Sequence, residues 1–146
     1  MNRKYCNVVV LISGSGSNLQ KLIDASLVSN YKISAVISNR PDAFGLQRAE
    51  RSNVPTRIVD HKSFESREAF DNFLANIIDE INPQLIVLAG FMRILGRDFV
   101  NRFSGKILNI HPSLLPKYKG LNTFQRVLKS NEKLTGCTVH FVNEKL

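Results

Sequence analysis

The stretch NVVVLISGSGSNLQ, residues 7–20, decides the fold of this chain. Its first seven residues are apolar almost throughout, as in a strand covered on both faces, and a glycine- and serine-rich turn then leads into a helical pattern. Five more strands are expected at residues 33–38, 56–60, 84–90, 106–110 and 137–142, and helices at residues 17–29, 44–52, 66–81, 97–103 and 123–130. This alternation predicts an α/β fold with a mostly parallel sheet wrapped by helices. The last strand alternates and carries Thr138 and His140, which is typical of an antiparallel strand near an edge.

Composition sets the class of protein. The 146 residues, 43% of them apolar, have the length of one domain with one core. The net charge of +8 is spread along the chain. A solvated surface is the first interpretation of this charge, attraction of small anions the second and a nucleic-acid groove the third. Without an apolar run long enough for a membrane span or a secretory signal, the chain is expected to be cytoplasmic, with no membrane partner. Cys6 and Cys137 lack metal-site spacing, so both are expected to be reduced and buried.

The turn SGSGSNLQ, residues 13–20, follows the first strand. Gly14 and Gly16 allow a tight turn that can approach an anion, and Ser17 or Asn18 is expected to cap the next helix, whose first amides would face a phosphate. The turn is not a P-loop, and a dinucleotide fingerprint fails at Leu19, where a third glycine is needed. The structural alternative is an ordinary glycine-rich turn between a strand and a helix.

The second strand ends in SNRPD, residues 38–42, without the acidic residue that would hold a ribose diol. NAD is therefore disfavoured, while Arg40 leaves NADP as a weaker alternative.

Two further strand ends carry candidate side chains. AGFMRILG, residues 89–96, exposes an arginine framed by apolar groups, which suits a flat heteroaromatic ligand, although the same residues could pack a helix onto the sheet. In ILNIHPSLLPKYKG, residues 107–120, Asn109 and His111 are two apart and are expected to face the same side, with Ile110 turned into the core. An amide and an imidazolium can both donate to an oxygen that gains negative charge in acyl transfer, and the imidazole can move a proton. A structural histidine is the alternative.

The whole chain resembles the family of folate-dependent glycinamide ribonucleotide (phosphoribosylglycinamide) formyltransferases. The segments that carry the resemblance are VVLISGSGSNLQ, ISNRPDAFGLQRA, SREAF, VLAGFMRIL, LNIHPSLLPKYKG and GCTVHFVNEKL, in the family order. The resemblance implies the formyltransferase fold, a Rossmann-like doubly wound sheet. It also implies transfer of a formyl group from 10-formyltetrahydrofolate to the amine of 5-phosphoribosylglycinamide in purine biosynthesis.

The same resemblance assigns roles to individual residues. The phosphate-binding turn would be Gly16, Ser17 and Asn18; the folate site would be lined by Met92, Arg93, Ile94, Leu95 and Asn109, with Arg67 meeting the folate's carboxylate tail. Asn109 and His111 would stabilise the oxyanion, and His111 would be the catalytic acid. The amine attacks directly, so no metal and no covalent enzyme intermediate are implied. The bond Leu115–Pro116 matches one that is cis in the family.

One departure concerns the end of the sequence. The family pattern continues past Leu146 with an aspartate that raises the histidine's pKa, and this residue is absent here. Residues 1–146 are therefore expected to form a single formyltransferase catalytic domain whose C-terminal part is missing, and a polypeptide that ends at Leu146 is expected to show negligible formyl transfer.

Three other functions stay open. The nearest is another folate-dependent formyl enzyme, such as a methionyl-tRNA formyltransferase or a formyltetrahydrofolate deformylase, and the others are an NADP-dependent oxidoreductase and a nucleotide- or RNA-binding module. Small-molecule substrates without nucleic acid are the expected partners. The sequence does not distinguish a monomer from a homodimer.

Overall fold

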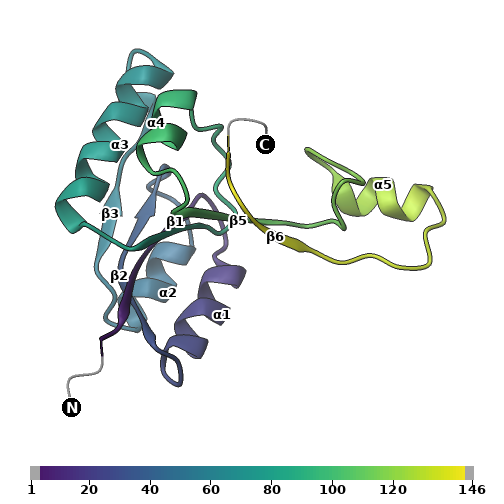
Figure 1. Ribbon diagram of the computed structural model, residues 1–146, viewed down its shortest axis with the longest axis horizontal. Helices are drawn as coiled ribbons and strands as arrows, with labels where there is room; N and C mark the ends of the chain where they lie inside the picture. Colours follow the sequence, from purple (N-terminus) through teal and green to yellow (C-terminus); the bar gives the residue numbers. More distant parts are fainter. Residues whose placement is uncertain (1–3, 144–146) are drawn as a thin grey trace.

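The computed structural model describes residues 4–143 and contains a six-stranded sheet with helices on both faces (Figure 1). The strand order is β3-β2-β1-β4-β5-β6, in which the first five strands are parallel and β6 runs antiparallel to β5. The mostly parallel sheet and the antiparallel edge strand are thus confirmed. The strands are β1 (Cys6–Ile12), β2 (Tyr31–Ser38), β3 (Thr56–Ile58), β4 (Leu85–Leu88), β5 (Ile107–His111) and β6 (Thr138–Phe141).

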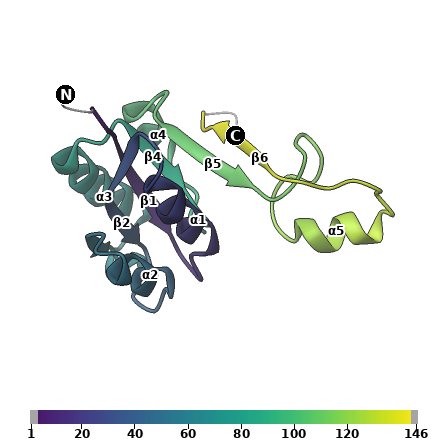
Figure 2. The same ribbon diagram turned by 90° about the horizontal axis from the view of Figure 1, so that it is seen from below.

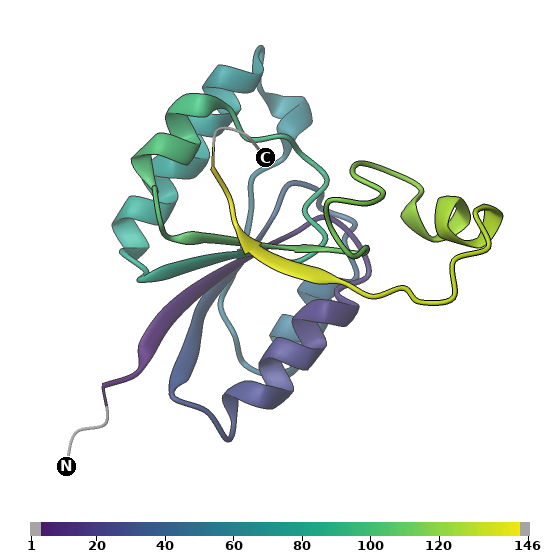
Figure 3. The same ribbon diagram turned by 45° about the vertical axis from the view of Figure 1, so that its right-hand side comes forward.

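The helices divide the core into two halves. Helices α1 (Ser17–Ser26) and α2 (Gly45–Arg51) cover one face of the sheet, and α3 (Arg67–Ile81) and α4 (Arg97–Arg102) cover the other (Figure 3). Alternate residues of the central strands enter the two clusters: Val8, Val10 and Ile12 of β1 pack against α1 and α2, and Val9 and Leu11 pack against α3 and α4. This two-sided burial explains why the central strands are apolar throughout.

Local signals set the bounds of α3. The Ser66 hydroxyl accepts a hydrogen bond from the Ala69 N–H at 3.1 Å, which caps the start of the helix. The helix ends at Ile81, and the next residue, Asn82, has a left-handed φ of 54° and precedes Pro83. The helix predicted at residues 66–81 is thus present; Phe70, Leu74 and Ile78 lie in the core, whereas Phe73 is 49% exposed.

A long arm leaves the body of the molecule after β5. Residues 112–137 extend past the end of the strand and carry α5 (Thr123–Lys129) before the chain returns as β6 (Figure 2). The Leu115–Pro116 bond is cis, as the resemblance implied. Leu121, Phe124 and Leu128 of the arm are exposed.

Three local predictions are wrong. Cys6 is only half-buried and Cys137 is exposed, because they stand at the start of β1 and in the arm just before β6, away from the core. Ile110 is half-buried, since the β5 face that carries it has less cover than the centre of the sheet. The family pattern at residues 144–146 lies outside the described residues. No helix among residues 4–143 is long and apolar enough to cross a membrane.

Candidate active site at the carboxyl edge of the sheet

Strand register aligns the candidate residues in rows across the sheet. Leu11 of β1 pairs with Leu88 of β4, which pairs with Asn109 of β5, and Asn109 pairs with His140 of β6. Leu11 and Leu88 belong to the cluster under α3 and α4, so Asn109 lies on that face, at the point where the apolar row becomes polar. About 10 Å, or two strand spacings, separates β1 from β5.

Asn109 and His111 share this face at the carboxyl end of β5, as the sequence predicts. Both side chains are half-buried. The Nε2 atom of His111 lies 2.9 Å from the carbonyl oxygen of Tyr118 in the arm. A carbonyl only accepts, so Nε2 carries a hydrogen, and Nδ1 is the ring nitrogen left for another partner. The arm thus holds the imidazole in a defined orientation.

The glycine turn after β1 is fixed by close backbone contact with α2. Gly16 has a φ of +75°, and a Cβ at this position would meet the Gly45 Cα at 2.6 Å. The Gly45 N–H donates to the Gly14 carbonyl at 3.0 Å, and Arg48 Nε donates to the Ser15 carbonyl at 2.8 Å. These contacts hold the turn against α2. It borders a hollow of about 240 Å³ that Arg40, Gly90 and Met92 also line.

The capping prediction for this turn is wrong. Gly16 is the N-cap residue of α1, and no side chain caps the helix. The reason is the left-handed backbone at Gly16, which starts the helix at Ser17 and makes both Ser17 and Asn18 helical residues. First-turn amides of a helix lack partners within the helix, so they can still face an anion.

The loop of residues 90–96 joins β4 to α4 beside this turn. Met92 and Ile94 are 68% and 76% exposed, which leaves them available to a ligand, whereas Leu95 packs against the core. The Arg93 guanidinium lies 5.1 Å from the ring centroid of Phe70. Arginine and apolar side chains therefore line one loop, as the sequence indicates for a flat heteroaromatic ligand.

Arg67 lies at the start of α3, beside the Gly96 end of this loop. It borders a cleft of about 350 Å³ between α3 and α4, where Arg97 and Arg102 also contribute. Glu68, Asp71 and Asp98 share the cleft and Arg102 is paired with Asp79, so the cleft has no excess of positive charge that would mark it as a carboxylate site.

Asp71 holds the far end of the 90–96 loop. Its Oδ2 atom accepts a hydrogen bond from the Gly96 N–H at 2.8 Å. Burial raises the pKa of this carboxyl above 3.8, and the Gly96 hydrogen bond and the charges of Arg93 and Arg67 only partly oppose the shift. The folded protein therefore holds the Asp71 proton more tightly than the unfolded chain does.

A pH dependence of stability follows from Asp71. The stabilisation from its raised pKa is complete below pH 3.8 and is lost as pH rises through the folded pKa. As pH rises from 3.8 through the folded pKa of Asp71, we expect the free energy of unfolding of the wild type to fall relative to that of Asp71→Asn. Urea titrations at stepwise pH measure both.

Asp42→Asn is the matched control for this experiment. The Arg40 guanidinium beside Asp42 holds the pKa of that exposed carboxyl below 3.8. The pH dependence therefore has the opposite sign: as pH rises, the free energy of unfolding of the wild type rises relative to that of Asp42→Asn. The same trend in both variants would contradict the assignment.

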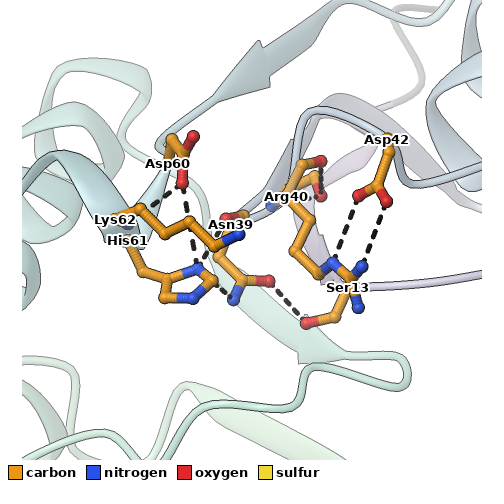
Figure 4. A network of polar contacts seen from close by, with 8 residues as sticks. Ser13, Asn39, Arg40, Asp42, Asp60, His61 and Lys62 are labelled. Carbon is orange, nitrogen blue, oxygen red and sulfur yellow. Dashed lines mark hydrogen bonds and ion pairs between the residues drawn. The ribbon is translucent and has the colours of Figure 1, made fainter.

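Sequence reasoning missed a polar network at the ends of β1, β2 and β3 (Figure 4). The Ser13 hydroxyl donates to Asn39 Oδ1 at 2.5 Å, and Asn39 Nδ2 lies 3.3 Å from His61 Nδ1. Ser13 and Asn39 are each 3% exposed. The sequence signal that could have predicted this network is that a polar residue follows each of two buried apolar strands, Ser13 after β1 and Asn39 after β2. Among residues 4–143, no three His, Cys, Asp or Glu side chains cluster as metal ligands would.

Comparison with known proteins identifies the family. Residues 6–146 match the formyl transferase family model, and the chain belongs to this family. It is 50% identical over 142 residues to the phosphoribosylglycinamide formyltransferase of Escherichia coli (strain K12), covering 96% of this chain and 67% of that protein. It is also 50% identical over 141 residues to the "Trifunctional purine biosynthetic protein adenosine-3" of Gallus gallus, covering 95% of this chain and 14% of that protein.

Solved structures give the same result for the fold. The phosphoribosylglycinamide formyltransferase of Coxiella burnetii superposes with a TM-score of 0.93 at 52% identity, covering 96% of this chain and 67% of that one. The enzyme of Brucella melitensis gives a TM-score of 0.94 at 44% identity, covering 97% and 75%. The formyltransferase fold expected from the sequence is therefore confirmed.

Proposed function

We propose that residues 1–146 form part of a single catalytic domain of a phosphoribosylglycinamide formyltransferase. The observation that carries the proposal is the placement of Asn109 and His111 on one face of β5, one strand from the 90–96 loop and two strands from the glycine turn. The relatives named above support the reaction. We infer 10-formyltetrahydrofolate as the formyl donor and 5-phosphoribosylglycinamide as the acceptor.

The proposed substrate sites follow the edge of the sheet. Gly16, Ser17 and Asn18 bind the phosphate through the start of α1, which favours an anion. The pteridine ring of the folate lies against Met92, Arg93, Ile94 and Leu95, and Arg67 meets its carboxylate tail. Both proposed substrates are anionic, so the net charge of +8 attracts them to the protein.

The proposed reaction is a direct acyl transfer. The amine nitrogen of the acceptor attacks the formyl carbon, and the formyl oxygen becomes an oxyanion that the Asn109 amide and the His111 imidazolium stabilise by donation. Nε2 of His111 donates to the Tyr118 carbonyl, so the N–H at Nδ1 of the imidazolium is the group that donates a hydrogen bond to the oxyanion. Collapse breaks the bond from carbon to N10 of the folate, the attacking nitrogen loses a proton, and N10 gains one.

A comparison of acceptors tests the function. We expect the full-length gene product with 10-formyltetrahydrofolate to formylate phosphoribosylglycinamide, and to act far more slowly on methionyl-tRNA or water. The measurement is release of tetrahydrofolate with each acceptor in turn. Faster hydrolysis or faster formylation of tRNA would assign the chain to another folate-dependent formyl enzyme. The cytoplasmic location, the metal-free reaction and the absence of nucleic-acid and membrane partners stay predictions.

A further inference from the structure

The 90–96 loop is tied to the sheet through one buried hydroxyl. The Met92 N–H donates to Ser13 Oγ at 2.8 Å, and the same hydroxyl donates its hydrogen to Asn39 Oδ1 at 2.5 Å. A hydroxyl has one hydrogen, so donation to Asn39 turns its lone pairs toward the Met92 amide. Ser13 thereby connects the glycine turn, of which it is the first residue, to the loop that exposes Met92.

Asn39 is itself held on two sides. Its backbone carbonyl accepts from the His61 N–H at 3.3 Å and lies 3.0 Å from His61 Nδ1, while its side-chain Nδ2 lies 3.3 Å from the same ring atom (Figure 4). With a hydrogen on Nδ1 the ring donates to the carbonyl, and without one it accepts from the amide. When Nδ1 carries no hydrogen and accepts from Nδ2, the Asn39 amide is held with its oxygen toward Ser13.

Strand register places this pair at the same level of the sheet. Ser13 follows Ile12 and Asn39 follows Ser38, and Ile12 and Ser38 are paired neighbours in β1 and β2. Both side chains are buried, where a hydrogen bond is strengthened and an unpaired polar group is costly. The buried pair thus has a single favourable arrangement.

We propose that Ser13 and Asn39 are positioning residues for the formyl donor: Asn39 orients the Ser13 hydroxyl, and the hydroxyl fixes the backbone of the 90–96 loop at Met92. The inference rests on the proposed function, because it assigns the loop to the folate. Neither residue takes part in the chemistry. Their loss weakens the site for the donor and leaves the phosphate turn, held separately by Gly45 and Arg48, in place.

The test compares Ser13→Ala, Asn39→Leu and the conservative Ser13→Thr in the full-length protein. We expect Ser13→Ala and Asn39→Leu to raise KM for 10-formyltetrahydrofolate by about tenfold, the effect of one lost buried hydrogen bond, with KM for the ribonucleotide and kcat little changed. Ser13→Thr keeps the hydroxyl and restores most of the affinity. Ser26→Ala, which removes a hydroxyl that donates to the Ile23 carbonyl of its own helix, is the control and leaves both KM values unchanged.

Hydrogen exchange of the Met92 amide supplies a readout that does not depend on activity. We expect this amide to exchange at least about tenfold faster in Ser13→Ala and to become less protected in Asn39→Leu, with no change in Ser26→Ala. Unchanged Met92 exchange, or an equal rise in both KM values, would overturn the inference. If the wild type formed no formylated product, the proposed function would fail and the exchange rates would still decide whether Ser13 and Asn39 anchor the loop.

Discussion

His111→Ala is expected to lower kcat for formyl transfer by about 10²–10⁴-fold while both KM values change little, because in the proposed mechanism the side chain acts on the oxyanion and not on the bound substrates. The measurement is steady-state formylation of phosphoribosylglycinamide by the full-length protein. Far-UV circular dichroism of the variant checks that the fold is retained.

His111→Gln separates chemistry from positioning. The glutamine amide can still donate to the Tyr118 carbonyl that His111 Nε2 contacts at 2.9 Å, but it has no titratable ring. We expect kcat of this variant to fall nearly as far as that of His111→Ala. Recovery of wild-type turnover in His111→Gln would mean that the ring only holds the arm in place, and the assignment of His111 as the acid would be withdrawn.

Gly16→Ala is expected to have the second large effect. A Cβ on Gly16 would stand 2.6 Å from the backbone Cα of Gly45, and the φ of +75° is unfavourable for any residue with a side chain. The strain and the overpacking together should lower the free energy of unfolding by at least about 2 kcal/mol. Relief of the clash must move the turn or α2, so KM for the ribonucleotide should rise at least about tenfold while KM for the folate changes less.

Gly14→Ala is the matched comparison for stability. A Cβ on Gly14 has no neighbour within 4 Å, so the free energy of unfolding should change by less than about 1 kcal/mol. Chemical denaturation and initial-rate kinetics measure both variants. An unchanged KM for the ribonucleotide in Gly16→Ala would mean that this turn does not bind the phosphate.

Periodicity was sufficient to predict the architecture of the sheet. Residues 85–89 are apolar throughout because β4 is covered on both faces. In β6, an edge strand that pairs with β5, the polar Thr138 and His140 are half-buried while Val139 and Phe141 are 60% and 56% exposed. The alternation therefore predicted an edge strand but not which of its side chains are covered. The spacing of Asn109 and His111 also predicted their shared face, because side-chain direction alternates along a strand regardless of tertiary contacts.

The contacts that shape the site depend on chain paths that no local pattern encodes. Gly16 could be recognised as a turn residue, but the need for glycine comes from Gly45, which is brought there by the packing of α2. The His111 contact with Tyr118 depends on the course of the arm, and the Ser13 contact with Met92 joins residues 79 positions apart. Such contacts follow from packing of whole elements, which explains why the polar network was missed.

The double-mutant cycle of Asn109→Ala and His111→Ala tests most directly whether both side chains act on one oxygen. The quantity is kcat for formyl transfer in the wild type, the two single variants and the double variant. Two donors to the same oxyanion should be strongly coupled, so we predict that the double variant loses much less than the product of the two single losses. Single losses that multiply in the double variant, or a single variant with wild-type kcat, would contradict a shared oxyanion site.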